Sequence, residues 1–321
     1  MQNFDLHSVD WSGNQQTSLT QQIKNKRGNG RMKYAIMDGK IIERSEAKVD
    51  VEDRGYQFGD GVYEVIRVYN GKMFTVTEHL NRLLKSLDSI GIQLPYTMDQ
   101  LTNLLEELIE KNNLQLGTIY MQISRGVAPR NHAFPTENVR PSLVAYTKEV
   151  SRPLESLKMG VRTIVTDDIR WLRCDIKSLN LLGNLLAKQK AAEADCFEAI
   201  QHRSGNVTEG SSSNIYMVKN GRVITHQSDN LILKGITKDV ILHVCEKNNI
   251  VVEERTFTLD ELIDAEEVFL SSTTAEVMPI IEVDGKRVRD GLPGPVTKLL
   301  QERFELEIEK QCGALVDKIL H

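Results

Sequence analysis

The sequence predicts an α/β protein, in the broad sense that includes α+β, with two domains of mixed sheets and flanking helices. Three observations support this fold class. The chain has 321 residues, enough for two domains of ordinary size. From Lys33 onward, short strand patterns alternate with helical patterns. Asp-Gly and Asn-Gly pairs between strand patterns indicate hairpins, and hairpins imply antiparallel pairing.

The first 31 residues differ from the rest of the chain. They are polar, rich in Gln and Asn, and show neither apolar periodicity nor the hydrophobic stretch of a secretory signal. Their basic end, residues 24–31, should be well solvated and pack poorly. We therefore expect residues 1–31 to be a disordered extension without function, and Met32 to be the natural start.

The smaller domain is expected to span residues 32–150. Asp38-Gly39 and Asn70-Gly71 predict the turns of its two hairpins, and leucines spaced three and four residues apart predict its two helices. The two hairpins, two helices and two further strands are expected at residues 34–42, 62–76, 77–90, 101–108, 118–124 and 142–146. The polar, proline-bearing residues 148–153 are the expected linker.

The larger domain is expected to span residues 151–313, followed by a tail at 314–321. Asn220-Gly221 predicts a turn, Gly235 a helix start, and Thr258 with Glu261 the capping box of another helix. The strands, hairpin region and remaining helices are expected at residues 161–165, 180–194, 197–225, 268–272 and 295–309. Proline near the start of the last helix suits a first helical turn.

Composition and charge exclude several classes of protein. The net charge of −5 argues against a nucleic-acid surface, which usually has a clustered basic face. No apolar run approaches the roughly 20 residues that a membrane span needs. The four cysteines are dispersed, which suits a reduced cytoplasm better than a disulfide framework. Neither the cysteines nor the histidines have metal-ligand spacing, so we expect no metal.

One lysine stands out once the common nucleotide and hydrolase motifs fail to match. The glycines at residues 55–61 do not fit GxGxxG, no P-loop occurs, and Ser211–Ser213 is not a nucleophile elbow. Lys177 follows a mostly uncharged stretch, precedes a helix and has Arg170 and Arg173 close upstream. Nearby cations and burial lower the pKa of an amine and favour its nucleophilic neutral form. On these residues alone, an ordinary surface lysine remains the alternative.

Four motifs extend the argument beyond Lys177. They are DRGYQFGDGVYE at residues 53–64, KSLNL at 177–181, TEGSSSN at 208–214 and LKGIT at 233–237. Together they resemble the fold-type IV pyridoxal-phosphate enzymes, in that family's order. The resemblance covers nearly everything from Met32 to about Ile308. It implies pyridoxal 5′-phosphate as the cofactor, bound between two domains.

The resemblance also assigns roles to individual residues. Lys177 would form a Schiff base with the cofactor and move the proton between the substrate Cα and the cofactor C4′. Glu209 would pair with the pyridine nitrogen, and Leu233 would pack on the ring. The backbone at Ile236 and Thr237, a helix start, would bind the phosphate. The remaining cofactor contacts would come from Arg82, Ser212 and Thr273.

The substrate residues distinguish members of this family. Arg130 and His132 match the RxH loop with which D-amino acid aminotransferases bind the substrate carboxylate, and Tyr63 would add a hydroxyl. The resemblance implies a homodimer in which this loop reaches the partner's site. The implied reaction converts D-alanine and 2-oxoglutarate to pyruvate and D-glutamate, a supply for peptidoglycan.

Three alternatives remain open. A branched-chain L-amino acid aminotransferase and an aminodeoxychorismate-type lyase share the fold and its cofactor motifs. A non-catalytic cofactor-binding protein is a different class, but it would not need Tyr63, Arg130 and His132 together with Lys177. A chiral assay that compares D-alanine with L-leucine separates a D-amino acid aminotransferase from the branched-chain alternative.

Overall fold

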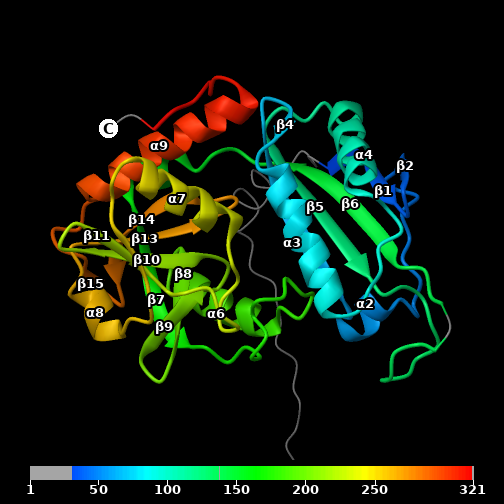
Figure 1. The fold of residues 1–321 in the computed structure, drawn as a ribbon, viewed down its shortest axis with the longest axis horizontal. Helices are drawn as coiled ribbons and strands as arrows, with labels where there is room; N and C mark the ends of the chain where they lie inside the picture. Colours follow the sequence, from blue (N-terminus) through cyan, green and yellow to red (C-terminus); the bar gives the residue numbers. More distant parts are fainter. Residues whose placement is uncertain (1–30, 137, 320–321) are drawn as a thin grey trace, which may run out of the picture. The chain divides into compact units, whose positions relative to one another are not determined.

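The structure, a computed structural model, describes residues 31–136 and 138–319. The expected disordered extension, except for Arg31, lies outside the described residues, as do Glu137 and the last two residues of the tail. Contacts group the chain from Met32 onward into one unit, and that unit contains two sheets (Figure 1). The expected fold class is confirmed. The domain boundary at residue 150 stays a prediction.

The first sheet is formed by the N-terminal part of this unit. Its strand order is β2-β1-β6-β5-β3-β4. These strands are β1 (Arg31–Met37), β2 (Lys40–Glu43), β3 (Gly61–Tyr69), β4 (Lys72–Met73), β5 (Gly117–Ser124) and β6 (Ser142–Glu149). Both expected hairpins are present and antiparallel. Their turn residues all have positive φ, from 49° at Asp38 to 82° at Gly39, which is why Asp-Gly and Asn-Gly occur there.

Two helices pack on one face of this sheet, α3 (Val76–Ser89) and α4 (Met98–Lys111). Leu80, Leu83 and Leu87 of α3 are buried against strand residues such as Ile66, as their helical spacing predicts. The second hairpin strand is shorter than expected. It ends at Met73, and Thr75 takes a left-handed conformation (φ 53°) that ends the extended backbone before α3 begins.

A short helix, α2 (Arg54–Phe58), is absent from the expected elements. Asp53 caps it by accepting hydrogen bonds from the backbone N–H groups of Gly55 and Tyr56. Gly59 ends the helix in the left-handed region, with φ 67°. Five residues are too few for a helical period to appear in the sequence.

The second sheet has the strand order β12-β11-β10-β13-β14-β7-β8-β9, with β15 paired to β14. Its strands are β7 (Val161–Asp167), β8 (Glu198–Arg203), β9 (Asn206–Gly210), β10 (Asn214–Lys219), β11 (Arg222–Thr225), β12 (Val252–Glu254), β13 (Glu267–Ser272), β14 (Glu276–Val283) and β15 (Lys286–Arg287). The β14–β7, β7–β8 and β11–β12 pairs are parallel and the others are antiparallel. The sheet is therefore mixed, as expected.

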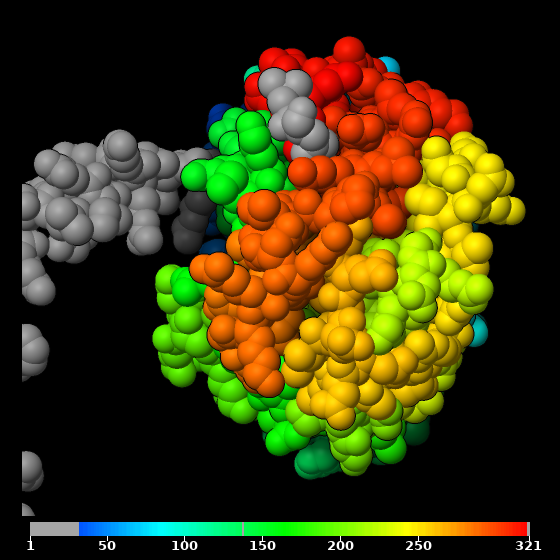
Figure 2. Space-filling view, turned by 90° about the vertical axis from the view of Figure 1, so that its left-hand side faces the viewer, coloured from blue at the N-terminus to red at the C-terminus, as the bar shows by residue number. Residues whose placement is uncertain are grey.

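Among the described residues, five helices accompany this sheet. They are α5 (Leu154–Met159), α6 (Leu182–Glu193), α7 (Ile236–Lys247), α8 (Leu259–Ile263) and α9 (Pro295–Cys312). Helices α7 and α9 share a buried cluster with Tyr216 and Phe269, whose rings stack 4.5 Å apart. In Figure 2, α9, in red, lies above the orange residues of the β13–β15 region. No helix within residues 31–136 or 138–319 has the length and apolar character of a bilayer span.

Part of the expected linker is tightly held. Strand β6 continues to Glu149, and the buried Arg152 forms ion pairs with Glu276 at 2.6 Å and Glu305 at 2.8 Å. The Tyr69 hydroxyl of the first sheet also donates to Glu276, at 3.0 Å. Within the expected linker, a buried charge network therefore joins elements of both sheets.

Candidate active site

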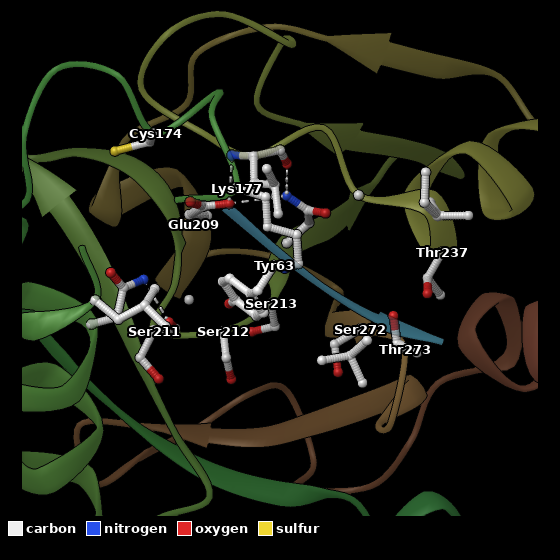
Figure 3. A pocket seen from close by; sticks show the side chains of 18 of the residues that line it. Tyr63, Cys174, Lys177, Glu209, Ser211, Ser212, Ser213, Thr237, Ser272 and Thr273 are labelled. Carbon is white, nitrogen blue, oxygen red and sulfur yellow. Dashed lines mark hydrogen bonds between the residues drawn. The ribbon is translucent and has the colours of Figure 1, made fainter. Parts of the chain in front are cut away.

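A cavity of about 250 Å³ brings most of the predicted site residues together (Figure 3). Its wall combines residues from β3 and α3 of the first sheet's layer with residues around β9, α7 and β13. The predicted residues that line it are Tyr63, Arg82, Lys177, Glu209, Ser212, Leu233, Ile236, Thr237 and Thr273. No group of three His, Cys, Asp or Glu side chains suited to a metal occurs in the described part of the chain.

Lys177 lies in the segment before α6, held against the first sheet. Its carbonyl accepts a hydrogen bond from the Tyr63 N–H at 3.0 Å, and its own N–H donates to Ser86 Oγ at 3.3 Å. The amine lies 4.3 Å from the centre of the Tyr63 ring. Among the described residues it has neither an ion pair nor a hydrogen bond, so its nitrogen is available to react.

Glu209, in β9, has a buried carboxylate that faces the cavity. Oε2 accepts hydrogen bonds from the Leu233 N–H at 3.0 Å and from Asn214 Nδ2 at 3.2 Å, and Oε1 forms an ion pair with Arg170. Burial raises the pKa of Glu209, and the charge of Arg170 opposes that rise. Asn214 Nδ2 also donates to the Leu233 carbonyl at 2.9 Å, so the same amide positions Glu209 and Leu233.

The start of α7 lines the cavity with the first turn of a helix that no side chain caps. Gly235 is the N-cap, no side chain caps the helix, and Ile236 and Thr237 form its first turn. A Cβ at position 235 would clash with the Asn214 side chain, which explains the glycine. Thr273 lies across from this turn, and in Figure 3 both threonines lie away from Glu209. Uncapped N–H groups and hydroxyls together suit a phosphate.

Arg82, on α3, is fixed by a carboxylate that the sequence did not draw attention to. Its Nε and Nη2 donate to Glu64 at 2.7 and 2.9 Å, and its Nη1 donates to the Lys234 carbonyl at 3.0 Å. His79 Nδ1 lies 2.8 Å from Glu64 as well. Burial alone would raise the pKa of Glu64, but Arg82 and His79 lower it to about 2. The guanidinium has two N–H groups left for a ligand.

Ser212 belongs to a loop organised by another buried carboxylate. Glu198 accepts hydrogen bonds from the hydroxyls of Ser211, Ser212 and Ser213 and from two backbone N–H groups of the same loop. The Ser212 hydroxyl donates its proton to Glu198 at 3.2 Å, so toward a cofactor it can only accept.

Arg130 and His132 do not lie in this cavity. Both are exposed, on a loop held against α2. The Arg130 guanidinium lies 4.5 Å from the Phe58 ring centre, the His132 ring lies 5.6 Å from the same ring, and Arg54 donates to the Asn131 carbonyl at 2.6 Å. The loop is therefore anchored to α2, and its Arg130 and His132 do not line the cavity that contains Lys177.

Several site residues received no role from the sequence. Arg170 and Asn214 contact Glu209, Glu64 contacts Arg82, and Glu198 orders the serine loop. Cys174 also lines the cavity, but burial raises the pKa of its thiol to about 11, which leaves it a poor nucleophile. One signal was available for Glu64 and Glu198, since a charged residue inside an otherwise apolar strand pattern requires a buried partner.

Known proteins similar in sequence support the resemblance. Residues 61–283 match the class IV amino-transferase family. The chain is 54% identical over 278 residues to the D-alanine aminotransferase of Staphylococcus aureus (strain COL), covering 87% of this chain and 99% of that protein. It is 51% identical over 286 residues to the D-alanine aminotransferase of Listeria monocytogenes (strain EGD-e), covering 88% and 98%.

Solved structures give the same result for the fold. The Escherichia coli branched-chain amino acid aminotransferase superposes with a TM-score of 0.83 at 28% identity, covering 90% of this chain and 97% of that one. The branched-chain amino acid aminotransferase of Thermobaculum terrenum, in its PLP-bound holo form, gives a TM-score of 0.77 at 27% identity, covering 88% and 95%. The expected fold type is confirmed, and this chain belongs to the class IV aminotransferase family.

Proposed function

We propose that this protein is a D-amino acid aminotransferase that uses pyridoxal 5′-phosphate held on Lys177. It transfers the amino group between D-alanine or other D-amino acids and 2-oxoglutarate, giving pyruvate and D-glutamate. The observation that carries the proposal is the cavity itself. It combines an amine without a partner among the described residues, a buried carboxylate and an uncapped helix start within one chain.

The residues present fit this cofactor. A phosphate requires several N–H and O–H donors, which the first turn of α7, Thr237 and Thr273 offer. Arg82 adds a positive charge whose direction Glu64 fixes. A protonated ring nitrogen requires a carboxylate, which Glu209 supplies at the opposite end of the cavity. Leu233, held by Asn214, would pack on the ring.

The chemistry then divides between the cofactor and the chain. When bound, the pyridoxal ring supplies an electron sink for the bonding pair released at the substrate Cα. Lys177 Nζ would remove the proton from that carbon and return a proton at the cofactor C4′. Glu209 would keep the ring nitrogen protonated, and Tyr63 beside Lys177 would place the substrate carboxylate near the amine that moves the proton.

We favour D-amino acids as the substrates over the branched-chain L-amino acids of the alternative function. The relatives named D-alanine aminotransferase share 51–54% of their residues with this chain over almost their whole length. The two branched-chain enzymes compared in structure share 27–28%. The branched-chain enzymes share the fold, but at 27–28% identity they support their substrate for this chain less than the D-alanine aminotransferases support theirs.

The substrate carboxylate requires a second chain in this proposal. Arg130 and His132 are exposed and lie outside the cavity, so they would reach the lysine of a partner in a homodimer. Exposed Leu182, Leu185 and Leu186 at the start of α6 offer apolar surface beside the cavity. The four cysteines are free, which fits the proposed cytoplasmic location.

A chiral transamination assay tests the proposal. Purified protein is incubated with cofactor, 2-oxoglutarate and a panel of D- and L-amino acids. We expect D-alanine to be consumed with equal release of pyruvate and D-glutamate, and L-leucine to be a poor donor. Consumption of L-leucine without D-alanine would favour the branched-chain alternative and contradict the proposal.

A further inference from the structure

The Glu209 carboxylate is held by three groups, only one of which is charged. Leu233 and Asn214 give Oε2 two neutral N–H donors, whereas Oε1 receives Arg170 Nη1. Glu209 is only 5% exposed. In such surroundings a carboxyl group favours its neutral form unless a cation is close. Among the described residues, Arg170 is the cation in contact with it.

Arg170 is itself held by the carboxylate of Asp168. Its Nε donates to Asp168 Oδ1 at 2.9 Å, and its Nη2 donates to Asp168 Oδ2 at 2.8 Å. Its backbone N–H also donates to Oδ1 at 3.0 Å, and Nη2 has a second acceptor in the Leu231 carbonyl. This two-point attachment directs Nη1 toward Glu209. A planar guanidinium can hold one carboxylate with two N–H groups and direct a third toward another, whereas an ammonium lacks this fixed fork.

Asp168 completes the arrangement and is shared with a second arginine. Its side chain is fully buried and also accepts hydrogen bonds from Arg203 Nε at 3.1 Å and Thr208 Oγ1 at 2.9 Å. Burial would raise the pKa of Asp168, but the hydrogen bonds and charge of Arg170 and the neighbouring Arg203 bring it to about 2. The row Arg203, Asp168, Arg170 and Glu209 therefore alternates in charge and sums to zero.

We propose that Arg170 is a positioning residue that fixes the direction of the Glu209 carboxylate and keeps it charged opposite the cofactor ring nitrogen. The inference rests on the proposed function, because Glu209 requires a ring nitrogen as its partner. Without Arg170, two neutral donors remain on a buried carboxylate. The pKa of Glu209 then rises further, and a larger fraction of the carboxyl group is protonated and cannot stabilise a positive ring nitrogen.

The test compares Arg170→Met with Arg173→Met, an exposed arginine three residues away that pairs with Asp175. We expect Arg170→Met to lower kcat about 10–100-fold at pH 7 and to weaken cofactor binding about tenfold. The acid limb of the profile of kcat against pH should move up by about one pH unit or more in this variant, so activity returns as the pH rises. Arg173→Met should match the wild type. An unshifted pH profile in Arg170→Met contradicts the proposal.

Double variants show whether Arg170 acts through Glu209. If it does, Arg170→Met combined with Glu209→Gln should be no slower and should bind cofactor no more weakly than Glu209→Gln alone. Losses that multiply would assign Arg170 an independent structural role. Arg203→Met separates the two arginines on Asp168, because Arg203 does not touch Glu209. An equal pH shift in Arg203→Met would mean that Asp168, and not Arg170, sets the behaviour of Glu209.

Folding and cofactor loading are checked separately. Thermal melting of the apoprotein shows whether Arg170→Met folds, and where it does not, Arg170→Lys replaces it. Lysine keeps the charge but lacks the rigid fork that attaches Arg170 to Asp168, so we expect a smaller shift of the acid limb in the same direction. A wild-type profile for Arg170→Lys contradicts the need for a fork. A wild-type protein that binds no pyridoxal phosphate would instead overturn the proposed function.

Discussion

The cavity around Lys177 and the loop that carries Arg130 differ in how they are held. In the cavity, Glu209 and Arg82 each have charged partners inside the chain, Arg170 and Glu64. On the loop, Arg130 and His132 pack against Phe58 but have no ion pair among the described residues, and both are exposed. The proposed reaction needs both regions in one active site, but within a single chain the loop residues do not line the cavity.

The difference indicates which parts of the proposed site one chain can build alone. Buried charges require partners, so Glu209 and Arg82, both proposed to hold the cofactor, are surrounded by groups that fix their direction. The residues proposed for the substrate carboxylate are presented outward on an anchored loop, as groups that serve a neighbouring chain would be. We therefore expect cofactor binding to be a property of the single chain and substrate binding to depend on a pair.

Replacement of Lys177 should have the largest effect. Lys177→Ala removes both the covalent attachment of the cofactor and the group that moves the proton, so we expect turnover to fall by several orders of magnitude. Turnover of D-alanine without added amines is the measurement. Lys158→Ala, at an exposed position on α5, is the matched control and should behave as wild type. Normal turnover by Lys177→Ala would remove the lysine from the mechanism.

Replacement of Arg130 should weaken substrate use without affecting the cofactor. Arg130→Ala should raise KM for D-alanine and lower kcat/KM by a factor that corresponds to about 2–4 kcal/mol of transition-state stabilisation. The reason is the loss of a charge-assisted contact to the carboxylate. Cofactor content, measured by absorbance, should stay intact, since the cavity lies elsewhere. Arg140→Ala, also exposed on this segment, is the control. Full D-alanine activity in Arg130→Ala would undermine the D-specific assignment.

Mixing two inactive variants tests the subunit arrangement directly. In a mixed dimer of Lys177→Ala and Arg130→Ala chains, one site carries both lesions and the other carries neither. Random pairing makes half of the dimers mixed, so about a quarter of the wild-type activity should return. Subunit exchange must be verified independently. Exchange without recovery would place the Arg130 loop in its own chain's site or outside both sites.

Local patterns predicted most elements and the cavity residues that belong to motifs. The hairpins at Asp38-Gly39 and Asn70-Gly71 and the capping box at Thr258 follow from chemistry within a few residues. The partners of the site residues do not. Arg170 lies 39 positions from Glu209, and Asp168 lies 35 from Arg203. The strand order of the sheet decides which charged residues so far apart in the sequence become neighbours. Local sequence patterns do not reveal that order.

The linker also shows that local composition does not reveal long-range contacts. Arg152 and Pro153 have the composition of a solvated connection, yet Arg152 is buried between Glu276 and Glu305. Its partners lie more than a hundred positions further on, so local composition does not predict its buried environment. Conversely, the exposed leucines of α6 had a helical pattern without revealing that one face stays uncovered in the single chain.

Glu209→Gln should have an intermediate effect. The amide keeps the shape and one acceptor, so we expect the cofactor to remain bound. It carries no charge to stabilise a protonated ring nitrogen, so kcat should fall about 100-fold. Steady-state rates and cofactor content are measured on the same preparation. A kcat equal to that of the wild type would show that the ring nitrogen does not depend on this carboxylate.

The smallest expected effect concerns acid stability at the Arg82 end of the cavity. Arg82 and His79 lower the pKa of Glu64 to about 2, below its value in an unfolded chain. A carboxyl group whose pKa is lowered by folding stabilises the fold at pH values above its pKa in the unfolded chain. This contribution is lost as the pH falls toward 2. Between pH 7 and pH 3, the wild type should therefore lose about 2 kcal/mol of unfolding free energy that Glu64→Gln does not lose. Denaturant titrations across this range, with Glu106→Gln on the exposed side of α4 as the control, measure the difference. If Glu64→Gln and Glu106→Gln show parallel pH profiles, the Glu64 carboxylate is not the charge that holds Arg82, and the contrast between the cavity and the Arg130 loop weakens.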